Sequence, residues 1–155
     1  MNKLVIMAGL PGTGKSYFNK NFIKEEHTTI SSDEIRIKLT GSYAKMLPNM
    51  NVVYDTMISE CNKIFSKNSD SFVVLDSTFL DSSRRTYFLD RIKGADYIEL
   101  VMLHASLETV LKRNHKRIKS KWVPEDVIKE MYSRYKEPNE IEKKRYNKIT
   151  NINFE

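Results

Sequence analysis

Eight residues near the start of the sequence have the types and the spacing that bind phosphate. Residues 9–16 read GLPGTGKS directly after the apolar run 4–8, and they match the pattern G-x-x-x-x-G-K-[S/T] at every position. Glycines let the backbone curl so that successive N–H groups surround phosphate oxygens, the lysine reaches the β- and γ-phosphates, and the serine hydroxyl binds Mg²⁺. We therefore predict a nucleoside-triphosphate site in this segment, the phosphate loop. The residues predicted to bind the triphosphate are Gly12, Thr13, Gly14, Lys15, Ser16 and Tyr17, with Ser16 as the metal ligand and Lys15 also catalytic.

Two further places put charged side chains where parallel sheets bind their ligands. Residues 28–31 read as a short strand that leads into Asp33 and Arg36, which are three apart at a helix start and project from one face. Residues 72–75 read as a buried parallel strand that ends at Asp76. Because ligands bind outside the carboxyl ends of parallel strands, these side chains are candidates to face a phosphoryl acceptor. The alternative for the first pair is a helix-capping acid and a surface arginine.

A strongly basic segment follows later in the chain. Residues 112–121 carry six lysines and arginines and no acidic residue. Arg113 and Arg117 are four apart, so they share one helix face despite their mutual repulsion, which a bound anion would offset. Pro124 suits the first position of another helix. We predict a basic helix–turn–helix over about residues 106–137, the lid, which covers the phosphates; the alternative is a merely solvated face.

Composition limits the class of protein. The chain of 155 residues is long enough for one domain, residues 1–155, with a full core. Its single cysteine excludes a disulfide framework, and its apolar runs are too short for a membrane span or a signal peptide, so we expect a cytoplasmic protein. Residues 106–150 carry 13 Lys and Arg against 7 Asp and Glu, which accounts for the whole net charge of +6. A basic patch on a phosphate-handling domain favours a polyanionic substrate.

The elements that must position these residues follow from periodicity and from capping residues. The predicted strands cover residues 4–8, 28–31, 72–75, 97–104 and 149–154, the last as an edge strand. Helices are predicted to begin near Lys15, after Ser31 or Ser32, at Met50, after residues 81–83, after Ser106 and at Pro124. In the last helix Val127, Met131 and Tyr135 form the predicted inner stripe. Alternating strands and helices predict an α/β domain with a parallel five-stranded sheet and helices on both faces.

Several of these motifs occur together in one known family. The phosphate loop, Asp33-x-x-Arg36, Asp76-Ser77-Thr78 with Arg84-Arg85, and the lid segment 112–117 with Val123-Pro124-x-Asp126-Val127 fall in family order. In these motifs the chain resembles, over nearly its whole length, the kinase domain of the phage-type 5′-hydroxyl polynucleotide kinases. The resemblance implies a P-loop kinase-like three-layer α/β/α fold with a helical lid. Two departures are Tyr17, where the family usually has Thr, and the lack of an Asp-x-Asp-Gly-Thr phosphatase motif.

The resemblance also implies an activity and a role for each matching residue. The reaction would transfer the γ-phosphate of ATP, or of another nucleoside triphosphate, to the 5′-OH end of DNA or RNA in nucleic-acid end healing or repair, with Mg²⁺. Asp33 would be the general base and Arg36 would bind the phosphate of the acceptor's terminal nucleotide. The implied acceptor-side residues are Asp76, Thr78 and Arg85. The implied clamp on the ATP phosphates consists of Arg117, as a catalytic residue, and Arg113.

Two rival functions share some of these features. A kinase of a nucleoside or another small metabolite would use the same phosphate loop and acid, although the basic surplus and Arg36 argue against it. A non-catalytic nucleic-acid-binding ATPase would bind or hydrolyse ATP without transfer to any end. The sequence does not distinguish DNA from RNA as partner, and it does not reveal the oligomeric state.

Overall fold

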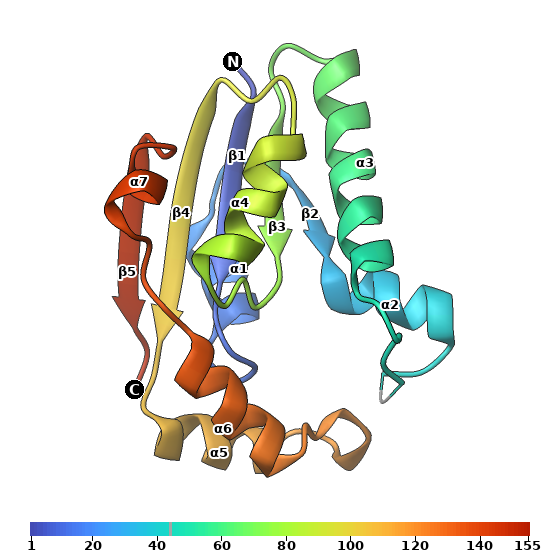
Figure 1. The fold of residues 1–155 in the computed structure, drawn as a ribbon, viewed down its shortest axis with the longest axis vertical. Coiled ribbons are helices and arrows are strands. Elements are labelled where there is room, and N and C mark those ends of the chain that lie inside the picture. Colours follow the sequence, from blue (N-terminus) through green and yellow to red (C-terminus); the bar gives the residue numbers. More distant parts are fainter. Residues whose placement is uncertain (44) are drawn as a thin grey trace.

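One parallel sheet organises the molecule. The computed structural model describes residues 1–43 and 45–155. The sheet has the strand order β2-β3-β1-β4-β5, and all neighbouring strands run parallel (Figure 1). Its strands are β1 (Lys3–Ala8), β2 (Thr28–Ser31), β3 (Phe72–Asp76), β4 (Tyr97–His104) and β5 (Lys148–Asn153). The predicted α/β fold is therefore confirmed, and each strand lies within one or two residues of its predicted run.

Helices cover both faces of the sheet because alternate strand residues point to opposite sides. Leu4 and Ile6 of β1 join the larger core with α2, α3 and α4, whereas Val5 and Met7 pack toward α1 on the other face (Figure 1). The covering helices are α1 (Lys15–Phe22), α2 (Ser32–Thr40), α3 (Asn51–Lys67) and α4 (Ser82–Arg91). Cys61 of α3 is fully buried in the larger core, and burial raises the pKa of its thiol to about 12.

Side-chain caps start three helices where the sequence predicts them. The hydroxyl of Ser31 accepts a hydrogen bond from the backbone of α2, and Asp81 and Ser106 do the same for α4 and α5. Gly41 ends α2 with a φ of 78°, a left-handed conformation that favours glycine. These caps fix where α2, α4 and α5 begin, and so fix the residues next to the carboxyl ends of the strands.

The lid lies across the end of the sheet where the strands stop. It consists of α5 (Leu107–Lys116), the short 3₁₀ helix η1 (Lys119–Lys121) and α6 (Glu125–Arg134), and α5 and α6 lie side by side (Figure 1). The predicted inner stripe of α6 is wrong in one respect, because the fully buried residue is Ile128. Val127 instead lines the pocket beneath the lid, whereas Met131 and Tyr135 pack against Ile128 and its neighbours as predicted. Ile128 packs with Leu10, Leu80 and Val110 and so anchors the lid to the phosphate loop and to the segment after β3.

The chain after the lid returns along the sheet. A short helix that the sequence did not indicate, α7 (Glu140–Lys143), precedes β5, which pairs with β4 at the edge. In the described part of the chain, no helix is both long enough and apolar enough to span a bilayer.

Candidate active site

The phosphate loop has the backbone shape that its glycines predict. Gly12 and Gly14 adopt φ values of 88° and 97°, which L side chains rarely reach. Gly14 is the N-cap of α1, and because it has no side chain it cannot accept hydrogen bonds from the first N–H groups of the helix. These N–H groups are left for a ligand. Thr13 lies behind the loop, where its buried hydroxyl donates to the Leu10 carbonyl oxygen at 2.7 Å. Its side chain therefore shapes the loop instead of reaching the pocket.

Close packing leaves no room for side chains at two of the glycines. A Cβ on Gly9 would collide with the Thr13 hydroxyl. A Cβ on Gly14 would lie 2.8 Å from the ring of Phe154, which follows β5 and packs against the loop. The Phe154 contact was not predicted, because nothing in the sequence places residues 140 positions apart together. The loop is thus a preformed cradle open on its pocket side.

Lys15 and Asp76 meet at the carboxyl ends of two adjacent strands. The Lys15 ammonium lies 3.5 Å from an Asp76 carboxylate oxygen, and both side chains are mostly buried. The register of β1 and β3, in which Met7 pairs with Asp76, brings them together. Ser16 follows Lys15 and lines the same pocket. No cluster of three or more acidic, histidine or cysteine groups suited to a metal occurs among the described residues.

These residues fit a triphosphate with Mg²⁺. Mg²⁺ usually keeps several waters and takes one or two protein ligands plus phosphate oxygens, so a full protein cage is not required. The Ser16 hydroxyl and the Asp76 carboxylate are the groups that would hold the ion. Bound there, Mg²⁺ would neutralise charge on the β- and γ-phosphate oxygens.

Asp33 and Arg36 form the opposite side of the pocket. An Arg36 guanidinium nitrogen lies 3.4 Å from an Asp33 carboxylate oxygen; the Asp33 side chain is 53% exposed, while that of Arg36 is only 9% exposed. Arg36 also donates to the Tyr43 carbonyl oxygen at 3.0 Å and to the Met46 sulfur at 2.9 Å. Its Nε is buried without a hydrogen-bond partner among the described residues. Both residues of the predicted pair therefore line the pocket, and the Nε–H of Arg36 remains available to a ligand.

The two lid arginines have different partners. Arg113 donates to the Gly12 carbonyl oxygen at 3.0 Å and so touches the phosphate loop. Arg117 donates to the Tyr43 hydroxyl at 3.0 Å, and its Nη1 is buried with no partner in the described chain. The ring of Tyr43 lies 5.2 Å from the Arg36 guanidinium carbon and 5.5 Å from that of Arg117. Tyr43 belongs to an irregular loop, and nothing in the residues around it predicts that it lies in the cavity.

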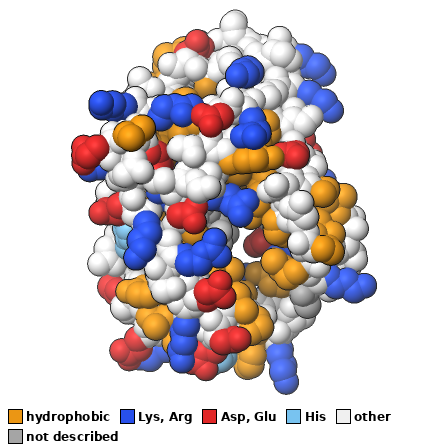
Figure 2. All heavy atoms as spheres, viewed as in Figure 1, with side chains coloured by type: hydrophobic (Ala, Val, Ile, Leu, Met, Phe, Trp, Pro, Cys, Tyr) orange, Lys and Arg blue, Asp and Glu red, His pale blue; other side chains and the backbone are white. Residues whose placement is uncertain are grey.

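All these side chains surround one cavity of about 840 Å³. It opens on the face shown in Figure 2, as a hollow between the lid and the part of the molecule formed by α2 and α3. Thr78, predicted to lie on the acceptor side, and Tyr17, predicted to bind the triphosphate, also line this cavity. Lid residues supply a largely apolar wall, which consists of Trp122, Val123, Pro124, Val127 and Met131. A polar floor under an apolar, basic lid suits a donor triphosphate and a second, sizeable substrate.

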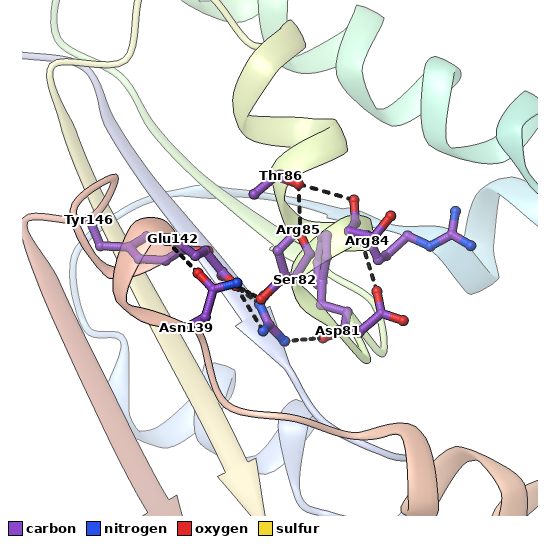
Figure 3. Close-up of polar contacts among 10 residues, drawn as sticks. Asp81, Ser82, Arg84, Arg85, Thr86, Asn139, Glu142 and Tyr146 are labelled. Carbon is purple, nitrogen blue, oxygen red and sulfur yellow. Dashed lines mark hydrogen bonds and ion pairs between the residues drawn. The ribbon is translucent and has the colours of Figure 1, made fainter.

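Arg85 is not part of this cavity, contrary to its predicted acceptor-side role. Its side chain is fully buried, with Nε donating to Glu142 at 2.7 Å and a terminal nitrogen donating to the Phe79 carbonyl oxygen at 2.8 Å (Figure 3). Ser82 and Tyr146 donate to the same carboxylate. Phe79 has a φ of 46°, the only left-handed non-glycine conformation among the described residues. Arg85 thus holds the turn that follows Asp76 and Thr78, and acts on the site only through that turn.

Comparison with known proteins agrees with this geometry. A family model described as an AAA domain matches residues 4–138. The chain belongs to this AAA-domain family. With its phosphate loop, Lys15 and the basic lid around one cavity, this AAA-domain chain has the α/β fold of the P-loop kinases.

The AAA-domain chain also matches individual relatives. It is 31% identical over 147 residues to the L-seryl-tRNA(Sec) kinase of Methanococcus maripaludis, across 87% of this chain and 53% of that protein. It is 26% identical over 152 residues to a protein named bifunctional polynucleotide kinase/RNA ligase from Autographa californica nuclear polyhedrosis virus, across 90% of this chain and 22% of that protein.

A solved structure shares the fold. A chain in the structure of the Pnkp1/Rnl/Hen1 RNA repair complex matches with a TM-score of 0.69 at 19% identity, over 94% of this chain and 46% of that one. The AAA-domain chain therefore spans about half the length of the seryl-tRNA(Sec) kinase. It spans a smaller share of the viral protein and of the matching chain in the RNA repair complex.

Proposed function

We propose that this kinase transfers the γ-phosphate of ATP to the 5′-OH end of a polynucleotide. The observation that carries the proposal is the pair on α2, in which the exposed carboxylate of Asp33 stands beside the buried guanidinium of Arg36. A carboxylate can accept the proton of an attacking hydroxyl, while an arginine binds phosphate through paired charge-assisted hydrogen bonds. An acceptor whose hydroxyl lies one nucleotide unit from a phosphate would occupy both residues at once.

The chemistry follows from the positions of the groups. The phosphate loop and Lys15 hold the triphosphate, and Arg113 closes on the loop from the lid. A bond forms between the acceptor 5′ oxygen and the γ-phosphorus, while the bond from that phosphorus to the β–γ bridging oxygen breaks and ADP leaves. The hydroxyl proton passes to Asp33. Because the transition state is loose, positioning and electrostatic stabilisation supply most of the rate, and an ordinary carboxylate suffices as base.

The relatives support an acceptor that is, or is attached to, nucleic acid. The name of the first relative specifies a seryl-tRNA, and the name of the second specifies a polynucleotide. The lid's charge agrees with this, since residues 112–121 carry six lysines and arginines and no acidic residue. A second candidate follows from the first relative alone: a kinase whose acceptor hydroxyl belongs to a small group, such as serine, instead of a ribose.

A direct transfer assay tests the proposal. The protein is incubated with γ-labelled ATP, Mg²⁺ and single-stranded or nicked 5′-OH oligonucleotides, as DNA and as RNA. We expect label on the 5′ end, and no label on matched oligonucleotides that already carry a 5′-phosphate. Unlabelled nucleosides and serine are added as competitors. If they suppress transfer as well as oligonucleotides do, the small-acceptor kinase replaces the proposed function; if no oligonucleotide is labelled, the proposal is wrong.

A further inference from the structure

The chain's only tryptophan stands at the rim of the active-site cavity. Trp122 lines the cavity, and 40% of the residue is exposed. Its indole N–H donates to the Arg117 carbonyl oxygen at 2.8 Å, and its ring meets that of His115 at an angle of 66° and a centroid distance of 4.8 Å. One edge of the indole is therefore fixed to the lid while part of its surface stays accessible.

A continuous series of contacts leads from the proposed base to this ring. Asp33 pairs with Arg36, and Arg36 donates to the Tyr43 backbone. The Tyr43 hydroxyl accepts from Arg117, whose carbonyl oxygen accepts from Trp122. The five residues come from α2, the loop after it and the lid, and all line the same cavity. This wall runs from Asp33, the proposed base, to Trp122.

The rim next to Trp122 is basic. Lys119 and Lys121 of η1 are exposed, and the preceding residues back to Lys112 include no acid. The nearest acids that follow in the chain, Glu125 and Asp126, lie in the first turn of α6, where the helix dipole stabilises them. Cations that flank an accessible aromatic ring are the elements from which proteins build sites for single-stranded nucleic acid.

We propose that Trp122, Lys119 and Lys121 form an extended binding site for a single-stranded acceptor, beyond its terminal nucleotide. A base downstream of the 5′ end stacks on the indole, and the two lysines face the phosphates that follow it. This proposal rests on the proposed function and specifies its substrate as a strand of several nucleotides, which the lid binds. Stacking on an aromatic ring tolerates any base, so the site reads length and single-strandedness, not sequence.

Acceptor length gives the first test. We compare kcat/KM for a nucleoside 3′-phosphate and for a 5′-OH trinucleotide, as DNA and as RNA. The native protein should prefer the trinucleotide by about 5- to 150-fold, the usual range for one stacked base. Trp122→Ala should remove most of this preference, whereas Trp122→Phe, which keeps a ring but loses the indole N–H, should retain most of it. Lys129→Ala, on the exposed side of α6, is the matched control and should keep the native ratio.

Fluorescence gives the second test, because Trp122 is the only tryptophan in the chain. Titration with an unlabelled 5′-OH oligonucleotide should quench its emission, and added salt should reverse the quenching. Lys121→Ala should reduce the slope of log affinity against log salt by about 1, as expected for one lost phosphate contact.

The outcomes separate this inference from the function on which it rests. Equal kcat/KM for the two acceptors in the native protein would overturn the extended site and leave the kinase assignment standing. Trp122→Phe losing as much as Trp122→Ala, on both acceptors alike, would show that the indole merely supports Arg117, and would also overturn it. If no nucleotide acceptor is phosphorylated, the proposed function fails; the titration then still decides whether a strand binds at Trp122.

Discussion

Lys15 and Arg36 are both cations at the cavity, but their surroundings differ. Lys15 has a carboxylate partner, Asp76, at 3.5 Å, and that partner is itself mostly buried. The partner of Arg36, Asp33, is half exposed, so solvent screens the pair more strongly. Arg36 therefore keeps more uncompensated positive charge in a buried place than Lys15 does. Such a place suits a bound phosphate.

Replacing Lys15 should abolish transfer without unfolding the protein. Lys15→Ala removes the ammonium that we propose contacts the β- and γ-phosphates, while the backbone cradle of the loop remains. We expect transfer to fall to background and the thermal unfolding midpoint to change little. Lys20→Ala, an exposed lysine later in α1, serves as control. Turnover near the native level in Lys15→Ala would show that the site lies elsewhere.

Replacing Arg36 should weaken only those acceptors that carry a phosphate. Hydrogen bonds to charged groups contribute about 1.5–3 kcal/mol, so Arg36→Ala should lower kcat/KM for a nucleoside 3′-phosphate by about 10- to 150-fold. Arg36→Lys keeps the charge but not the planar fork and should recover part of the loss. A bare nucleoside should be a poor substrate for the native protein. If the native protein uses both acceptors equally well, Arg36 does not bind the acceptor.

At the scale of elements, α5 presents two arginines one turn apart to different parts of the cavity. Arg113 is engaged by the phosphate loop, whereas Arg117 reaches Tyr43 and keeps one buried nitrogen unpartnered within the described chain. The helix ends at Lys116, so Arg117 is its carboxyl cap and its backbone already turns away. We therefore propose that Arg117, not Arg113, is the lid arginine that binds the transferring phosphate.

The lid arginines should therefore differ in their effects. An arginine that stabilises the transferring phosphoryl group can contribute about 10³–10⁵ in rate, and we expect Arg117→Ala to lose kcat in that range. Arg113→Ala should mainly raise KM for ATP. Lys112→Ala, an exposed lysine on the same helix, should change neither. Small and equal losses in all three variants, measured by steady-state kinetics, would mean that the basic segment is only a solvated face.

The sequence predicted those elements whose signals are local. The five strands, the caps at Ser31, Asp81 and Ser106, and the placement of Asp33 and Arg36 beside the phosphate loop follow from short patterns and from the rule for parallel sheets. The buried face of α6 was misassigned at one position, because the adjacent residues Val127 and Ile128 are both apolar and tertiary packing buries Ile128.

Other features depend on contacts between distant segments, for which a single sequence carries no signal. Tyr43 joins the site through the path of an irregular loop, and Phe154 through the pairing of the last strand. Arg85 was predicted at the acceptor because a matching motif places an arginine there. Its true partner, Glu142, is 57 residues away in the sequence.

At the scale of the whole molecule, the Arg85–Glu142 pair ties the segment after the lid to the turn after β3. Burial alone would raise the pKa of Glu142, but hydrogen bonds from Arg85, Ser82 and Tyr146 outweigh it and lower that pKa. The backbone of Lys136 also donates to the Leu80 carbonyl oxygen at 2.8 Å, so two links hold the same turn. The ionised pair is therefore part of what keeps Asp76 and Thr78 in place.

Glu142→Gln should destabilise the fold by about 3–5 kcal/mol, because it leaves a buried guanidinium without its counter-charge. Urea unfolding measures this, with Glu140→Gln, an exposed acid on the same short helix, as control. Since the folded pKa of Glu142 is lowered, its contribution is present above the ordinary carboxyl pKa and is lost as pH falls through the folded value. The native protein should thus lose stability at acidic pH more steeply than Glu142→Gln. Parallel pH profiles would contradict this role.

The position of β5 has a consequence for the order in which the protein matures during synthesis. Of the five strands β5 is translated last, yet the residues just after it contact segments that are translated earlier: Phe154 packs against Gly14, and Glu155 accepts hydrogen bonds at the start of α5. Domains fold as units, with earlier segments emerging from the ribosome before later ones. A nascent chain that has released β1 to β4 therefore has a phosphate loop without its aromatic backing and a lid without its tether. We expect nucleotide to be captured only once Phe154 and Glu155 have emerged and reached the phosphate loop and α5.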